Sequence, residues 1–162
     1  MKIIKLLSIA IMIASSTANA QNTNFLEKLK GAWQANGTAF GMPADVNMEW
    51  MAVLGGRFTQ IQYKILMHGK DGKSQQFEGT AYYKPSGDNQ YWATWFDTNG
   101  EMHPITASSN ESTLTSLWGT PETKMGKTLY KLLDDKTVEV TDYIQKKDGS
   151  WQQFGKNTLI KK

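Results

Sequence analysis

The chain has 162 residues, no cysteine and a formal net charge of +3. The lack of cysteine excludes disulfides and thiolate metal sites, although small exported domains often depend on disulfides. A charge this close to zero, with no cluster of lysines beyond two pairs, excludes the strongly basic surface that nucleic acids or anionic membranes require.

Residues 1–20 are typical of a secretory signal peptide. Lys2 and Lys5 precede a short apolar stretch, and Ala18-Asn19-Ala20 supplies the small residues of a cleavage site. The apolar stretch is too short for a transmembrane helix, which needs about 20 such residues. We therefore expect a soluble exported protein, periplasmic or extracellular, that begins near Gln21. Loss of the two lysines lowers its formal charge from +3 to +1.

Residues 21–162 have the length of one domain and open with a short amphipathic helix. Asn24 can cap it, the segment Phe25-Leu26-Glu27-Lys28-Leu29-Lys30 places its apolar residues on one face, and Gly31 ends it. No later segment keeps a helical period, so the rest of the domain is expected to be all-β.

Beyond the helix, β-rich runs alternate with turn residues every 8–14 positions, roughly, as in sandwiches and barrels. Apolar and polar residues alternate within 45–52, 60–67 and 137–141, which predicts strands with one wet face. The ten expected strands are 31–39, 45–53, 57–67, 75–84, 89–97, 101–107, 111–118, 125–133, 136–146 and 150–161.

The links between these runs favour antiparallel neighbours. Asp71-Gly72, Asn99-Gly100 and Asp148-Gly149 are dipeptides that accept positive φ in tight hairpins. Ten such strands in one sheet would curl and close, which also removes the exposed edges. The sequence therefore predicts a single antiparallel closed barrel of about ten strands.

The residues around the first strand carry a resemblance. Gly31-Ala32-Trp33 resembles the Gly-x-Trp signature that opens the lipocalins and related calycin barrels, in which the tryptophan closes the base under a basic side chain. The resemblance implies structural roles for Gly31 and Trp33. If Trp33 points inward, Ala35, Gly37 and Ala39 point inward with it, and their small size leaves room.

The wider pattern is similar to a family of secreted bacterial lipocalin-like domains without an assigned activity. The matching pieces are Trp50, Gly55-Gly56-Arg57-Phe58, Gly79 and Tyr91-x-x-x-Trp95-Phe96-Asp97-x-x-Gly100. Lipocalins place their stacking arginine on a late strand, whereas this chain ends in Lys161-Lys162. The pattern thus favours a ten-strand relative of the fatty-acid-binding or nitrobindin type, with an internal cavity.

A cavity for a small hydrophobic molecule is the leading functional hypothesis, because ligand pockets are mostly apolar with a few polar groups. The alternative is that the side chains expected to bind this molecule, given next, instead fill the barrel together with Trp33 and Trp118. The residues expected to bind the ligand are Met48, Trp50, Arg57, Tyr63, Met67, Tyr83 and Trp95.

Arg57 is the single arginine among lysines, which suggests a planar stacking or bidentate role. Two roles are open: stacking on the ring of Trp33, or pairing with a ligand carboxylate. The two roles predict different effects of the substitution Arg57→Lys. Stacking predicts lower thermal stability with ligand affinity kept, and pairing predicts selective loss of acidic ligands.

Other chemistries have less support in the sequence. His68 and His103 are the only candidates for metal or haem ligation, and no cofactor is otherwise indicated. The set Arg57, Glu49 and Tyr63 is where lyase or isomerase chemistry would be sought, but no Gly-x-Ser-x-Gly elbow is present, so a binding protein is favoured over an enzyme. A protein-interaction module that works through its rim loops remains open, and the oligomeric state is not determined.

Overall fold

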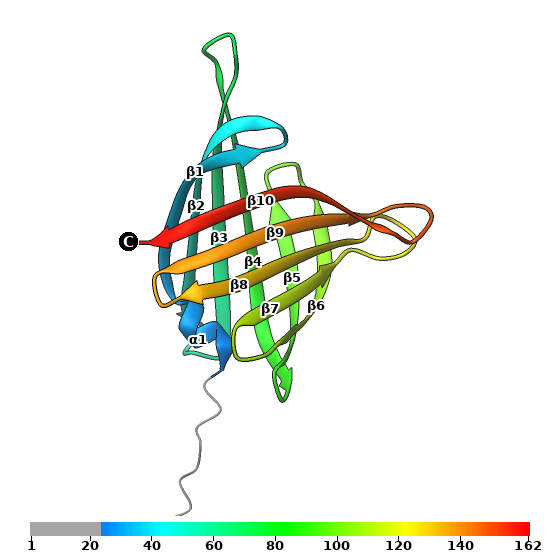
Figure 1. Ribbon diagram of the computed structural model, residues 1–162. Helices are drawn as coiled ribbons and strands as arrows, with labels where there is room; N and C mark the ends of the chain where they lie inside the picture. The colour runs from blue at the N-terminus through cyan, green and yellow to red at the C-terminus, as the bar shows by residue number, and fades with distance from the viewer. Residues whose placement is uncertain (1–23) are drawn as a thin grey trace, which may run out of the picture.

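The alternating segments fold into ten antiparallel strands, seen in a computed structural model that describes residues 24–162 (Figure 1). The expected all-β class is confirmed. One short helix, α1 (Phe25–Leu29), precedes the strands within this range. The strands are β1 (Gly31–Ala39), β2 (Met42–Val53), β3 (Phe58–His68), β4 (Ser74–Gly87), β5 (Gln90–Asp97), β6 (Met102–Ser109), β7 (Thr113–Trp118), β8 (Gly126–Asp134), β9 (Thr137–Gln145) and β10 (Trp151–Lys161).

The sheet closes into a barrel in which every strand pairs with its sequence neighbours and β1 pairs with β10. This up-and-down order confirms the predicted closed barrel. α1 and the even-numbered hairpins, from β2–β3 to β8–β9, lie at one end, which we call the base. The hairpins that follow the odd-numbered strands lie at the other end, which we call the mouth; β1–β2 and β3–β4 project there in Figure 1.

The predicted helix is confirmed, and it closes the base. Asn24 caps it by accepting a hydrogen bond from the backbone N–H of Leu26 at 3.1 Å. Phe25, Leu26 and Leu29 are fully buried, and the Leu29 carbonyl accepts a hydrogen bond from Trp33 Nε1 at 2.7 Å. Because Trp33 is itself fully buried, this bond satisfies a donor that would otherwise be unpaired.

The cation over Trp33 is Lys161, not Arg57. The Lys161 ammonium lies 4.9 Å from the centre of the indole ring, and β1 pairs Trp33 with Lys161 in register. Arg57 lies exposed in the β2–β3 hairpin. The prediction that Arg57 stacks on Trp33 is therefore wrong. The basic residue over Trp33 thus comes from the last strand, β10.

The base half of the barrel is filled by its own side chains. Trp33, Trp50 and Tyr83 are among the largest fully buried residues. The Trp50 ring lies 5.3 Å from Tyr83 and 5.3 Å from Tyr130, the latter edge-on, which is a favourable aromatic geometry. The Tyr83 hydroxyl is paired with Ser116 at 2.9 Å. The base is thus solid.

The seam between β1 and β10 is closed in two ways. Near the base, backbone pairing joins Trp33 to Lys161 and Gln34 to Ile160. Nearer the mouth, the side chain of Asn157 replaces the backbone: its Oδ1 accepts from the Thr38 N–H at 3.1 Å, and its Nδ2 donates to the Thr38 carbonyl at 3.0 Å. The seam near the mouth therefore depends on one amide.

The signal peptide predicted for residues 1–20 lies outside the described residues. Among residues 24–162, no helix has the length and apolar character needed to cross a membrane.

Candidate ligand-binding cavity

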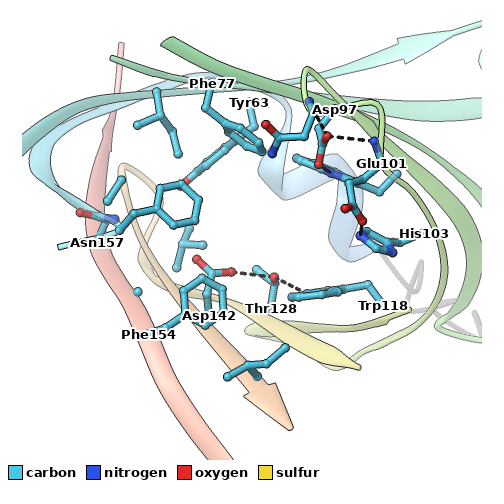
Figure 2. A pocket seen from close by; sticks show the side chains of 18 of the residues that line it. Tyr63, Phe77, Asp97, Glu101, His103, Trp118, Thr128, Asp142, Phe154 and Asn157 are labelled. Atoms are coloured by element: carbon cyan, nitrogen blue, oxygen red, sulfur yellow. Dashed lines mark hydrogen bonds and ion pairs between the residues drawn. The ribbon is translucent and has the colours of Figure 1, made fainter. Parts of the chain in front are cut away.

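The mouth half of the barrel contains a cavity of about 400 Å³. Inward-facing side chains of every strand except β2 line it, and Figure 2 shows most of them converging on one space. The apolar part of the wall includes Tyr63, Ile65, Phe77, Trp95, Ile105, Trp118, Tyr130, Val140 and Ile144. The size and apolar character are those of small-molecule pockets, which measure about 300–1,000 Å³.

Two tryptophans lie flat against the wall because each covers a glycine on the neighbouring strand. A methyl group placed on Gly79 of β4 would overlap the ring of Trp95 on β5, and one placed on Gly126 of β8 would overlap the ring of Trp118 on β7. A larger residue at either glycine would force the indole off the wall. The two glycines therefore help to keep the cavity open.

The first prediction tests this packing. Gly79→Ala is expected to displace Trp95 towards the cavity, lowering stability by about 1–3 kcal/mol and weakening the binding of apolar ligands. Gly87→Ala, on the same strand, is the matched control, since an added methyl group there meets atoms no closer than 3.8 Å. Urea denaturation measures the stability of both variants, and ligand titration measures their affinity for apolar ligands. Equal behaviour of the two variants would contradict the role given to Gly79.

A polar chain crosses one side of the cavity from β7 to β9. Trp118 Nε1 donates to Thr128 Oγ1 at 3.2 Å, and Thr128 Oγ1 donates to Asp142 Oδ1 at 2.7 Å. Since an indole N–H can only donate, the threonine hydroxyl is left to donate to the carboxyl. Burial raises the pKa of Asp142 to about 6, and the Thr128 hydrogen bond opposes part of that rise.

Three buried tyrosines lie at or below the cavity floor. Burial raises the pKa of Tyr63 far above its usual range, and the negative charge of Asp142 adds to the effect. Burial also raises the pKa of Tyr130 well above that range and the pKa of Tyr83 to about 12. These phenols therefore stay protonated at neutral pH and offer hydrogen bonds rather than charge.

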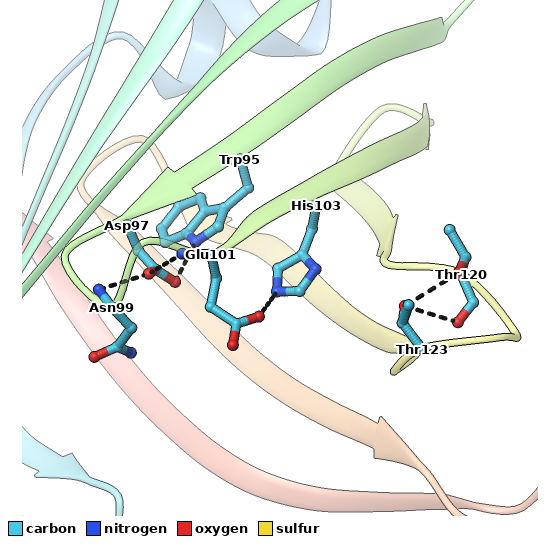
Figure 3. A network of polar contacts seen from close by, with 7 residues as sticks. All are labelled: Trp95, Asp97, Asn99, Glu101, His103, Thr120 and Thr123. Atoms are coloured by element: carbon cyan, nitrogen blue, oxygen red, sulfur yellow. Dashed lines mark hydrogen bonds and ion pairs between the residues drawn. The ribbon is translucent and has the colours of Figure 1, made fainter.

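The β5–β6 hairpin carries a second polar network at the mouth (Figure 3). Asp97 Oδ2 accepts from Trp95 Nε1 at 3.1 Å, and Asp97 Oδ1 accepts from the backbone N–H of Asn99 at 2.9 Å. Glu101 is paired with His103 Nε2 at 3.2 Å, and the His103 ring lies 5.5 Å from Trp118. The network fixes the hairpin and the tilt of Trp95 without closing the cavity.

Exposed aromatic side chains mark the opening. Phe40 is 59% exposed and Phe154 43% exposed, yet both line the cavity. Phe40 occupies the two-residue β1–β2 loop with a φ of +50°, a conformation that favours glycine or asparagine, and its ring contacts Phe77 edge-on at 5.9 Å. The structure thus holds an exposed aromatic ring, in a strained backbone conformation, at the opening of the cavity.

The second prediction exploits this strain. Phe40→Asn is expected to keep or raise the unfolding free energy by up to about 1 kcal/mol, because asparagine tolerates positive φ. It is also expected to lower the affinity for apolar ligands severalfold, because it removes an aromatic ring from the opening. Thermal denaturation and ligand titration check the two effects. A variant that is destabilised and binds normally would show that Phe40 serves the turn alone.

The structure separates the seven residues expected to bind a ligand. Tyr63 and Trp95 line the cavity. Met48, Trp50 and Tyr83 are packed in the solid base half, and Met67 is buried on β3 without reaching the cavity. Arg57 is at the opposite end of the barrel from the mouth, so the expectation that it pairs with a ligand carboxylate in the cavity is wrong.

The residues considered for other chemistries are also dispersed. Glu49 is exposed on the outer face of β2 and Arg57 is exposed in the base hairpin, so only Tyr63 of that trio reaches the cavity. His68 is on the surface, paired with Asp45 at 3.1 Å, whereas His103 lines the cavity. Within residues 24–162, no three His, Asp or Glu side chains gather as metal ligands do.

Sequence reasoning missed the polar lining of the cavity. Asp142 continues the inward alternation of Val138 and Val140 and is followed by Ile144, so a carboxyl on the core face could have been found by extending that pattern. Thr128 holds the equivalent position before Tyr130 on β8. A polar residue on an apolar face was the available signal.

Comparison with protein-family models and with curated proteins found no match for this chain.

Proposed function

We propose that this chain is an exported carrier or sensor that holds a small, mainly apolar molecule in a calycin-like barrel. The observation that carries the proposal is the cavity in the mouth half, walled by aromatic and aliphatic side chains and open past Phe40 and Phe154. A barrel built only for stability has no need of a void, because unfilled space in a core costs free energy. Export rests on the signal-peptide pattern of residues 1–20.

The arrangement of the polar groups supports binding rather than catalysis. Asp142, Thr128 and Trp118 form one chain on one side of the wall, and no buried histidine or lysine is hydrogen-bonded to it among residues 24–162. Few polar groups within an apolar wall are what orients a ligand in a binding site.

Mass spectrometry tests the proposal. The purified protein is measured under native conditions, and the same sample is then extracted under denaturing conditions. A small apolar molecule that leaves the protein only on denaturation supports the carrier. Protein that is repeatedly ligand-free, and that also ignores fluorescent apolar probes, would overturn it.

That negative outcome would favour the interaction module, for which the outer face offers a surface. Trp92 is 66% exposed and Met102 is 65% exposed, and Phe96 pairs with Met102 across β5 and β6. Haem is tested separately by titration: a Soret shift abolished by His103→Ala but not by His68→Ala would indicate haem in the cavity, since only His103 lines it.

A further inference from the structure

Three carboxyl groups line the cavity, those of Asp97, Glu101 and Asp142, and only Asp142 lies away from the β5–β6 hairpin, on β9. Asp142 faces inward between Val140 and Ile144 on β9 and lies beside Thr128 and Trp118 in Figure 2. Its Oδ1 is occupied, because Thr128 donates to it at 2.7 Å and the direction of that proton is set by Trp118. One oxygen of the carboxyl is thus committed to the protein.

The other oxygen, Oδ2, has no hydrogen-bond partner within the described part of the chain. None of the ion pairs among residues 24–162 includes Asp142. The nearest residue of β10 is Gly155, at a β-bulge, where a side-chain carbon would come within 3.1 Å of Oδ2. Glycine at this position keeps the space in front of Oδ2 free for another molecule.

The charges around the cavity favour a cation over an anion. The cationic candidates on the wall are Lys124, in the mouth loop, and His103, which is paired with Glu101. The acidic groups are Asp97, Glu101 and Asp142. A carboxylate ligand would have to bring a second negative charge beside Asp142 in a poorly solvated space, which is unfavourable.

Resting on the proposed function, we infer that the ligand is an amine with an aromatic or aliphatic body, whose ammonium group donates a hydrogen bond to Asp142 Oδ2. The hydrogen bond between the ammonium and the carboxylate would offset the cost of taking both charges out of water, since a charge-assisted hydrogen bond is about twice as strong as a neutral one. Trp118, Tyr63 and Tyr130 line the same cavity, and an aromatic face there would add cation–π attraction for the ammonium group. Fatty acids are excluded by the same reasoning.

Three ligands of one shape test the inference by calorimetric titration: 4-phenylbutylamine, 4-phenylbutanol and 4-phenylbutyrate. At pH 7.5 the amine is expected to bind at least about tenfold more tightly than the alcohol, and the carboxylate most weakly. Asp142→Asn is expected to abolish the preference for the amine while the alcohol keeps its affinity. Asp88→Asn, which changes the same charge in an exposed turn, is the control and should keep the preference.

The pH dependence of the preference for the amine provides a second test, because a purely structural role for Asp142 would not produce it. The titratable groups facing Asp142 are Tyr63 on β3 and Tyr130 on β8, both protonated at neutral pH, with His103 and Glu101 nearer the mouth. The amine preference should therefore shrink as the pH falls below about 6, where Asp142 itself is protonated.

The outcomes separate the two proposals. Equal binding of amine and alcohol by the wild type, a preference that survives Asp142→Asn, or tightest binding of the carboxylate would each overturn the amine assignment and leave the apolar carrier standing. Failure of all three compounds and of uncharged apolar probes to bind would overturn both.

Discussion

Ala39→Trp is expected to weaken the binding of small apolar ligands at least about tenfold while the barrel stays folded. Ala39 is a buried, inward-facing residue of β1 on the cavity wall, beside the opening marked by Phe40. An indole there projects into space that the wild-type protein leaves open. The loss of stability should therefore not exceed the roughly 1–3 kcal/mol that is typical of overpacked cores. Titration with a fluorescent apolar probe measures the loss.

Ala52→Trp is the matched control for this substitution. Ala52 is exposed near the base end of β2 and does not line the cavity. Its replacement by tryptophan adds the same side chain without obstructing the mouth, so probe affinity should stay within about twofold of wild type. If Ala39→Trp binds the probe as tightly as Ala52→Trp does, the probe is not in the cavity.

Asp142→Asn is expected to make the protein more stable at neutral pH, by up to about 3 kcal/mol. Burial raises the pKa of the Asp142 carboxyl from 3.8 to about 6 in the folded state. Between these two values the unfolded chain has already released its proton while the folded chain still holds it. The wild type therefore loses stability as the pH rises from about 4 to about 6, and the asparagine variant does not.

Urea denaturation at pH 4 and at pH 7.5 measures the difference. The variant and the wild type should have similar unfolding free energies at the lower pH and diverge at the higher one, whereas the exposed control Asp88→Asn should follow the wild type at both. A variant that is less stable at pH 7.5 would mean that the carboxylate is favourably solvated in the fold. A carboxyl kept at such a cost to stability is typical of a functional site.

The fold could be predicted because its determinants are local. Alternation along β3 and β9 gave the inward faces, and hairpin dipeptides such as Asn99-Gly100 gave the links. The start of β2 was placed three residues late, at 45 instead of Met42. Phe40-Gly41 forms a two-residue hairpin loop although phenylalanine is a poor residue for positive φ, so the turn had no local signature.

The division of the barrel into a solid base and an open mouth could not be predicted, because it depends on which residues meet across strands. Trp50 and Trp95 are both inward-facing tryptophans. Trp50 packs against Tyr83 and Tyr130 and fills space, whereas Trp95 lies over Gly79 and leaves space. That difference is fixed by the register between strands, which a single sequence does not give.

The misassignment of Arg57 has a similar cause. Its isolation among lysines suggested a stacking role, but the ring of Trp33 is covered by a residue that pairs with Trp33 across the seam between β1 and β10. Lys161, near the C-terminal end, satisfies that condition, and the base hairpin with Arg57 does not. The rarity of arginine suggested Arg57 as the cation over Trp33, whereas the pairing that closes the sheet places Lys161 there.

The most direct test of the cavity uses the six tryptophans as reporters, because they occupy three environments. Trp95 and Trp118 line the cavity, Trp33 and Trp50 are buried in the base, and Trp92 and Trp151 are on strand faces outside it. The measurement is a two-dimensional NMR titration of the indole N–H resonances with 4-phenylbutanol. Shifts confined mainly to Trp95 and Trp118 are the predicted result; shifts centred on Trp92, or none at saturating ligand, would contradict a ligand site inside the barrel.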